Sequence, residues 1–110
     1  MPFPLPVLVL GAHLILVADN VPKLDVEPSC KAAAADGGAE YKSTFADCMS
    51  DENSARAAVA KEWSTFKASD VRECLYETQS DGTPSYVELQ ECLELARDAA
   101  KEENPKGPKL

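Results

Sequence analysis

The chain has 110 residues, with 19 acidic and 11 basic side chains and a formal net charge of −8. This length fits one small domain. The acidic balance argues against nucleic-acid binding, because that function requires clustered Lys and Arg.

Residues 1–18 carry no charge and predict a secretory signal. Their apolar run, 7–18, matches the h-region of a signal peptide and is too short to span a bilayer comfortably. Ala18 is the predicted −1 residue for cleavage, although Leu16 at −3 is larger than usual. The segment before the run departs from the signal pattern in having no Lys or Arg, and one explanation is that the signal is truncated. The alternative is a buried or membrane-anchoring segment. We expect a periplasmic or secreted protein that has no membrane contact after signal removal.

Two prolines and the lack of a helical period predict an extended lead-in over residues 19–28, followed by a helical domain over 29–101. Ser29 is the expected N-cap of a short Ala-rich helix at 30–36, which ends at Gly37-Gly38. Residues 40–47 are expected to add an irregular helical turn.

The clearest helix is predicted to start at Ser50 and to run to about Phe66. Its apolar residues recur at helical spacing and form one stripe: Ala55, Val59, Trp63 and Phe66. We expect Trp63 to be the centre of the core.

A third helix is predicted from Ser69 to about residue 79, followed by a polar turn at 79–83. The last helix has two start signals, namely Thr83-Pro84 and a capping box from Ser85 to Glu88. It is expected to end near Lys101, with a disordered tail at 102–110. No segment alternates as a strand does, so the predicted fold is all-α.

Four cysteines are separated by 18, 26 and 18 positions along the chain. An even number in a short exported chain predicts two disulfides, and three pairings are possible. Each 18-residue interval is centred on a turn sequence, which favours Cys30–Cys48 and Cys74–Cys92 as staples of two helical hairpins. Zinc is not expected, because no two cysteines are close in sequence and the single histidine, His13, lies in the presumed signal.

The residues do not indicate an enzyme or a cofactor. Without a histidine in the mature chain, no Ser-His or Cys-His pair can form. Residues 77–88 have the length of an EF-hand loop, with weak candidate ligands at Glu77, Asp81, Ser85 and Glu88. Pro84 and an uncharged third position depart from that pattern, so a turn with a capping box is the favoured interpretation.

Several motifs resemble a group of small exported four-cysteine proteins of alphaproteobacteria. They are Cys48-x-x-x-Glu52-x-x-Ala55-Arg56, Trp63-x-x-Phe66, Arg72-x-Cys74 and the stretch from Pro84 to Glu94, PSYVELQECLE. The resemblance covers about residues 21–100 and implies export, helices and disulfides, but no activity. Cys-x-x-x-Glu-x-x-Ala with a downstream Trp is also similar, more loosely, to periplasmic lysozyme-inhibitor-like helical proteins.

We therefore expect a non-enzymatic periplasmic or secreted module that binds an unknown protein partner or has a structural role. One alternative is an acidic inhibitor or sequestering partner of a basic envelope protein such as a lysozyme, because a charge of −8 would speed the encounter. A calcium-responsive module using the 77–88 loop is a further alternative.

Overall fold

The computed structural model describes residues 20–103, and these form an all-α domain. The helices are α2 (Glu27–Ala34), α3 (Tyr41–Lys61), α4 (Ala68–Gln79) and α5 (Tyr86–Glu103), with short 3₁₀ turns at Gly38–Glu40 and Trp63–Thr65. The expectation of a helical domain made of two hairpins is confirmed. The predicted signal, residues 1–18, lies outside the described residues.

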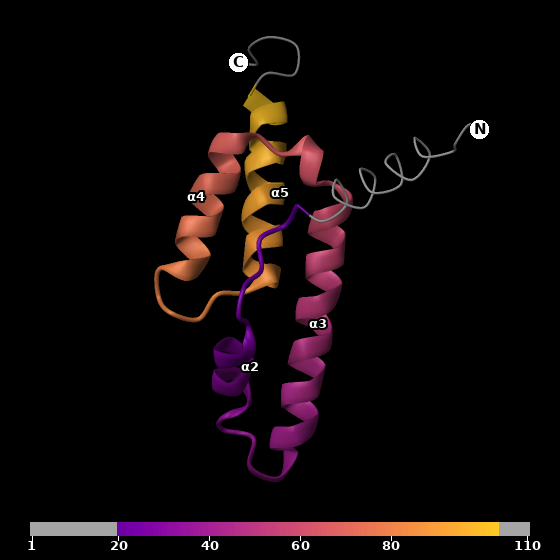
Figure 1. Ribbon diagram of the computed structural model, residues 1–110, viewed down its shortest axis with the longest axis vertical. Coiled ribbons are helices and arrows are strands. Elements are labelled where there is room, and N and C mark those ends of the chain that lie inside the picture. Colours follow the sequence, from indigo (N-terminus) through magenta and orange to yellow (C-terminus); the bar gives the residue numbers. More distant parts are fainter. Residues whose placement is uncertain (1–19, 104–110) are drawn as a thin grey trace, which may run out of the picture.

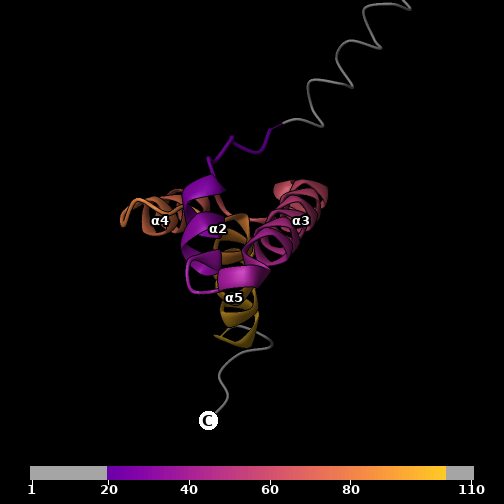
Figure 2. The same ribbon diagram turned by 90° about the horizontal axis from the view of Figure 1, so that it is seen from below.

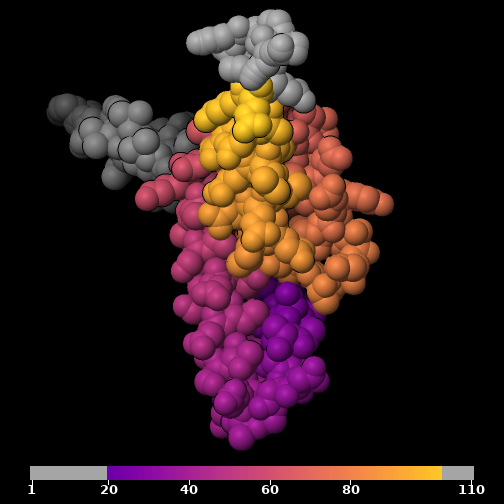
Figure 3. Space-filling model, turned by 180° about the vertical axis from the view of Figure 1, so that it is seen from behind, coloured from indigo at the N-terminus to yellow at the C-terminus, as the bar shows by residue number. Residues whose placement is uncertain are grey.

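The chain runs down and up through the four helices, so that α3 and α5 point in the same direction (Figure 1). α2 packs on α3, α3 packs on α5, and α4 packs on α5. Seen from below, α5 lies between α3 and α4 (Figure 2). Seen from behind, α5 occupies the middle of the surface and α2 lies below it in the view (Figure 3).

Both disulfides have the predicted pairing. Cys30–Cys48 joins α2 to α3, and Cys74–Cys92 joins α4 to α5. Their Cα atoms are 5.5 and 5.7 Å apart, within the usual range for a disulfide. Each bridge therefore holds one hairpin together, and neither crosses from one hairpin to the other.

Several predicted helix starts are wrong. Ser29, Ser50 and Ser69 all lie inside helices rather than at their caps. α2 begins earlier because Pro28 fits the first helical turn, where its missing N–H costs nothing. α3 begins at Tyr41, so residues 41–47 are regular helix rather than the expected irregular turn, since no Gly or Pro interrupts residues 41–61. At the other end, α5 continues past Lys101 to Glu103.

The segment of residues 20–26, here called the strap, leads into α2 without helical structure, whereas residues 27 and 28 of the predicted lead-in belong to α2. It crosses the face of α5 beside α3 (Figure 1). Its side chains Val21, Leu24 and Val26 are buried in the core. The strap is therefore part of the packed domain. Its apolar residues cover a part of the core that would otherwise need a further helix to cover it.

The core lies where α3, α5 and the strap meet. Leu89, Leu93 and Val59 are its most completely buried large side chains. Trp63 is only partly buried and packs against the edge of this cluster, so its predicted place at the centre is wrong. The reason is that α3 ends at Lys61, and Trp63 begins a 3₁₀ turn that leaves the helical stripe.

An ion pair and a hydrogen bond link the end of α3 and this 3₁₀ turn to α5. Arg97 donates to Glu62 Oε1 at 2.8 Å and to Thr65 Oγ1 at 3.0 Å. Its guanidinium carbon also lies 4.9 Å from the centroid of the Phe66 ring. The hydrogen bond with Glu62 raises the pKa of Arg97 above its ordinary value. These contacts fix the connection between α3 and α4 against α5.

Candidate functional site

A buried carboxylate connects the two hairpins. Glu52 of α3 is 4% exposed, and its Oε2 accepts the Ser85 hydroxyl at 2.6 Å. Its Oε1 accepts the backbone N–H of Tyr86 at 2.5 Å. Tyr86 is the first residue of α5, where unpaired N–H groups and the helix dipole favour a negative charge. Glu52 therefore caps α5 from another helix.

The predicted capping box at Ser85 is half correct. Ser85 Oγ does accept the backbone N–H of Glu88, at 3.2 Å. The Glu88 carboxylate, however, does not return to Ser85. The Ser85 N–H donates to Thr78 Oγ1 at 2.9 Å, and the Thr78 hydroxyl lies 2.9 Å from Glu88 Oε1 and 3.2 Å from Ser85 O. The buried Thr78 of α4, which is 3% exposed, thus accepts the Ser85 N–H that the Glu88 carboxylate would accept in a complete capping box.

Tyr86 holds the strap against the domain. Its hydroxyl accepts the backbone N–H of Leu24 at 2.7 Å and donates to the carbonyl of Pro22 at 2.9 Å. The side chain is 4% exposed, and its ring lies 5.9 Å from the guanidinium carbon of Arg56. One phenol therefore satisfies two backbone groups of a segment more than 60 residues away.

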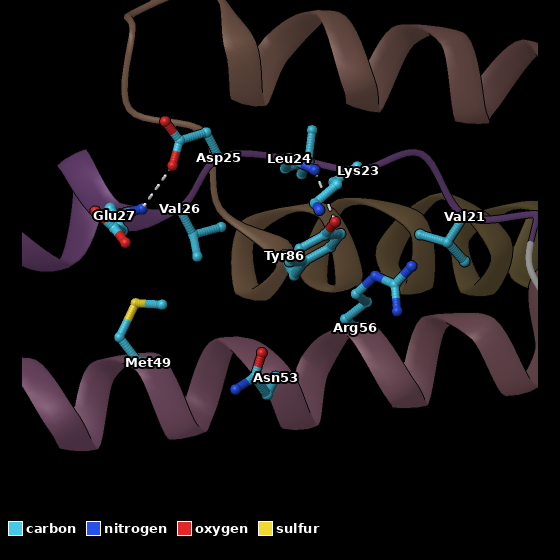
Figure 4. Close-up of a pocket in the computed structure, with 10 residues that line it drawn as sticks. All are labelled: Val21, Lys23, Leu24, Asp25, Val26, Glu27, Met49, Asn53, Arg56 and Tyr86. Atoms are coloured by element: carbon cyan, nitrogen blue, oxygen red, sulfur yellow. Dashed lines mark hydrogen bonds between the residues drawn. The ribbon is translucent and has the colours of Figure 1, made fainter.

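An open groove of about 940 Å³, here called the strap groove, lies between the strap and α3. Figure 4 shows the strap along one side, α3 along the other and Tyr86 between them. The lining combines apolar, amide and charged side chains from the strap, α2, α3 and α5: Val21, Lys23, Leu24, Asp25, Val26, Glu27, Met49, Asn53, Arg56 and Tyr86.

Charge is separated along the strap groove. Asp25 and Glu27 lie at the end near α2, whereas Lys23 and Arg56 lie toward the middle and the Val21 end (Figure 4). Met49 and Asn53 line the α3 side between the two ends. Tyr86 thus both holds one wall of the groove in place and contributes to its lining.

A second groove, here called the hairpin groove, lies between α4 and α5 and has a volume of about 490 Å³. Its lining includes four carboxylates and no basic residue: Cys74, Glu77, Thr78, Asp81, Glu88, Glu91, Cys92 and Leu95. The backbone N–H and hydroxyl of Thr83 both donate to Asp81 Oδ1 and lower the pKa of Asp81. Leu95 is 70% exposed beside these acids.

Residues 77–88 comprise the end of α4, the connection at 80–85 and the first residues of α5. Ser85 is buried with its hydroxyl bound to Glu52, and Glu88 Oε1 accepts the Thr78 hydroxyl. Gly82 has φ +84°, which allows the chain to reverse there. Within residues 20–103, no group of three or more His, Cys, Asp or Glu side chains is placed to hold a metal ion. Two of the four candidate ligands, Ser85 and Glu88, therefore have hydrogen-bond partners within the domain.

Glu52, Thr78 and the partners of the Tyr86 hydroxyl were not predicted from the sequence. A signal for Glu52 was present, because it lies three residues before Ala55 and so shares the buried face of α3. Thr78 lies four residues after the buried Cys74 and so shares the buried face of α4. Both are polar residues on an apolar stripe.

Among the described residues, no helix combines the length and the apolar character needed to cross a membrane. The two disulfides are compatible with a non-cytoplasmic protein. A comparison of the chain with protein-family models, curated proteins and solved structures gave no match.

Proposed function

We propose that this chain is a non-enzymatic, exported binding module that holds a protein partner in the strap groove. The observation that carries the proposal is the construction of the groove. Its strap wall is fixed by the Tyr86 hydroxyl, and its α3 wall is fixed by Cys30–Cys48 and by the Glu52 bonds to α5. A groove that is formed before binding loses less conformational entropy when a partner enters.

Export is part of this proposal. The uncharged apolar run at 7–18 and the two disulfides support a periplasmic or secreted location. N-terminal sequencing of the protein recovered from the periplasm or medium tests it. We expect a start near Asp19, and an intact Met1 would contradict export by a cleaved signal.

The binding function is tested by capture of partners from an envelope extract on immobilised protein. Asn53 is exposed and lines the strap groove, so Asn53→Arg should fill the groove without disturbing the core. Ala57→Arg is the matched control, since Ala57 is exposed on the same helix and outside the groove lining. We expect a partner that the wild type and Ala57→Arg retain and Asn53→Arg loses. Equal retention by all three proteins would contradict binding through this groove.

The hairpin groove supports a second candidate, an acidic partner of a basic envelope protein such as a lysozyme. Glu77, Asp81, Glu88 and Glu91 line it without a basic residue, and the hydrogen bonds from Thr83 lower the pKa of Asp81. Such a field would steer a cationic protein to this face.

Titration calorimetry with a basic lysozyme tests this candidate. We expect binding that weakens with salt and is reduced by the double variant Glu77→Gln/Glu91→Gln. Glu73→Gln/Glu102→Gln removes the same charge at exposed sites outside the groove and should have less effect. Equal effects of the two double variants would show only general attraction and would contradict a specific site.

A further inference from the structure

We infer that the occupant of the strap groove is an extended peptide segment with an acidic residue near one end and a basic residue near the other. This inference rests on the proposed binding function and names the chemistry of the partner. It depends on three features of the groove: its length along the strap, the order of its charges and the exposed amide of Asn53.

The shape of the groove fits a short extended chain. Its lining runs along the strap from Val21 to Glu27. An extended peptide rises about 3.3 Å per residue, so a segment of about six residues matches this length. The groove is open along its side rather than enclosed, and its volume of about 940 Å³ is near the upper limit for small-molecule pockets.

The order of charges determines the orientation of the peptide. Its acidic residue would lie beside Lys23 and Arg56, and its basic residue would lie beside Asp25 and Glu27. There it would compete with Lys31, whose Nζ lies 3.9 Å from Glu27 Oε1. Because the groove carries charges of both signs, it does not suit a uniformly anionic ligand such as nucleic acid. It does not suit an uncharged lipid surface either. A peptide with the opposite charge order pairs with both ends at once.

The side chains between the two ends suit a peptide backbone. The Asn53 amide is exposed, makes no hydrogen bond within residues 20–103 and carries both a donor and an acceptor. A peptide group offers the complementary pair. Met49, which is partly buried beside Asn53, adapts its shape to different apolar side chains. We therefore expect one apolar residue of the peptide to lie between its two charged residues.

The inference is tested first with a phage-displayed library of random octapeptides, selected on the full disulfide-bonded protein. We expect enriched sequences in which an acidic and a basic residue flank an apolar residue in one fixed order. Enrichment without that charge order, or no enrichment above an uncoated surface, would overturn the inference.

The second step exchanges the charges of the groove, using one synthetic peptide from the selection and one with its two charges reversed. Lys23→Glu and Glu27→Lys should each weaken binding of the selected peptide by about tenfold, since each replaces an attraction by a repulsion. The double variant has the net charge of the wild type and should prefer the reversed peptide. Lys61→Glu and Glu73→Lys make the same changes at exposed sites outside the groove and should have little effect.

Equal effects of groove and control variants, or no preference of the double variant for the reversed peptide, would overturn the inference. The proposed function can be judged separately. If partner capture is still lost in Asn53→Arg while the peptide assay shows no charge dependence, the groove binds a partner but the partner is not such a peptide.

Discussion

The carboxylate of Glu52 accepts the backbone N–H of Tyr86, which lies 34 positions further along the chain. The other carboxylate oxygen accepts the hydroxyl of Ser85. No disulfide crosses from one hairpin to the other, so this bond is a principal polar connection between them. Tyr86 in turn holds the strap, and the position of the strap groove therefore depends on Glu52.

Glu52→Ala is expected to lower the free energy of unfolding by about 3 kcal/mol, because it leaves the Ser85 hydroxyl and the Tyr86 N–H buried without their acceptor. Glu52→Gln keeps one carbonyl acceptor and should cost less. Asp51→Ala removes a neighbouring but exposed carboxylate and serves as the control. Urea denaturation measures all three. Equal stability of Glu52→Ala and Asp51→Ala would show that the buried bonds are not important for stability.

Tyr86→Phe removes the hydroxyl that bridges Leu24 and Pro22 while it retains the buried ring. We expect a loss of about 1–2 kcal/mol, because the change removes two hydrogen bonds and leaves the Leu24 N–H without its acceptor. Amide hydrogen exchange should become faster in residues 21–26. Tyr76→Phe changes a side chain that is 74% exposed and should alter neither quantity. Unchanged exchange in the strap would contradict its attachment through Tyr86.

Leu93→Ala is expected to cost about 3–5 kcal/mol, since Leu93 is completely buried. Trp63→Ala should cost less than Leu93→Ala, even though Trp is the larger side chain, because Trp63 packs at the edge of the core. Thermal or urea unfolding of both variants compares the two positions. A larger loss of stability for Trp63→Ala than for Leu93→Ala would show that Trp63 is the centre of the core.

Removal of either disulfide should destabilise the protein by about 3 kcal/mol, because the two bridges close loops of equal length. The paired variants Cys30→Ala/Cys48→Ala and Cys74→Ala/Cys92→Ala allow the comparison. Without Cys74–Cys92, hydrogen exchange should increase most in α4, since α4 packs on α5. Exchange that rises first in α2 of that variant would contradict this arrangement.

Calcium should not stabilise the connection at residues 77–88. Glu88→Ala should cost about 1 kcal/mol or less, because the Thr78 hydroxyl can still donate to the Ser85 carbonyl. The melting temperature of the wild type and of Glu88→Ala should be the same in millimolar calcium and in a chelator. A rise in calcium that Glu88→Ala abolishes would show that the loop binds the ion.

Local sequence patterns predicted the helical class and the disulfide pairing, because the apolar period and the turn sequences act over short distances. They failed for the starts of α2, α3 and α4, where serines resembled caps although the helices began earlier. They also failed for Trp63, because the end of α3 at Lys61 could not be recognised from the apolar stripe.

The candidate site was less predictable than the fold. The strap groove requires Leu24 and Tyr86 to meet across 62 positions, and the cap of α5 requires Glu52 to reach Ser85 across 33. Such contacts depend on how the two hairpins pack together. The spacing of residues within one helix or turn therefore cannot predict these contacts.

The most direct test of binding through the strap groove is photo-crosslinking in the native compartment. A photoreactive amino acid replaces Asn53 in one variant and Ala57 in another, and both positions are exposed on α3. We predict a crosslinked product at a defined mass from position 53 and no such product from position 57. The same product from both positions, or from position 57 alone, would contradict the proposal that this groove holds the partner.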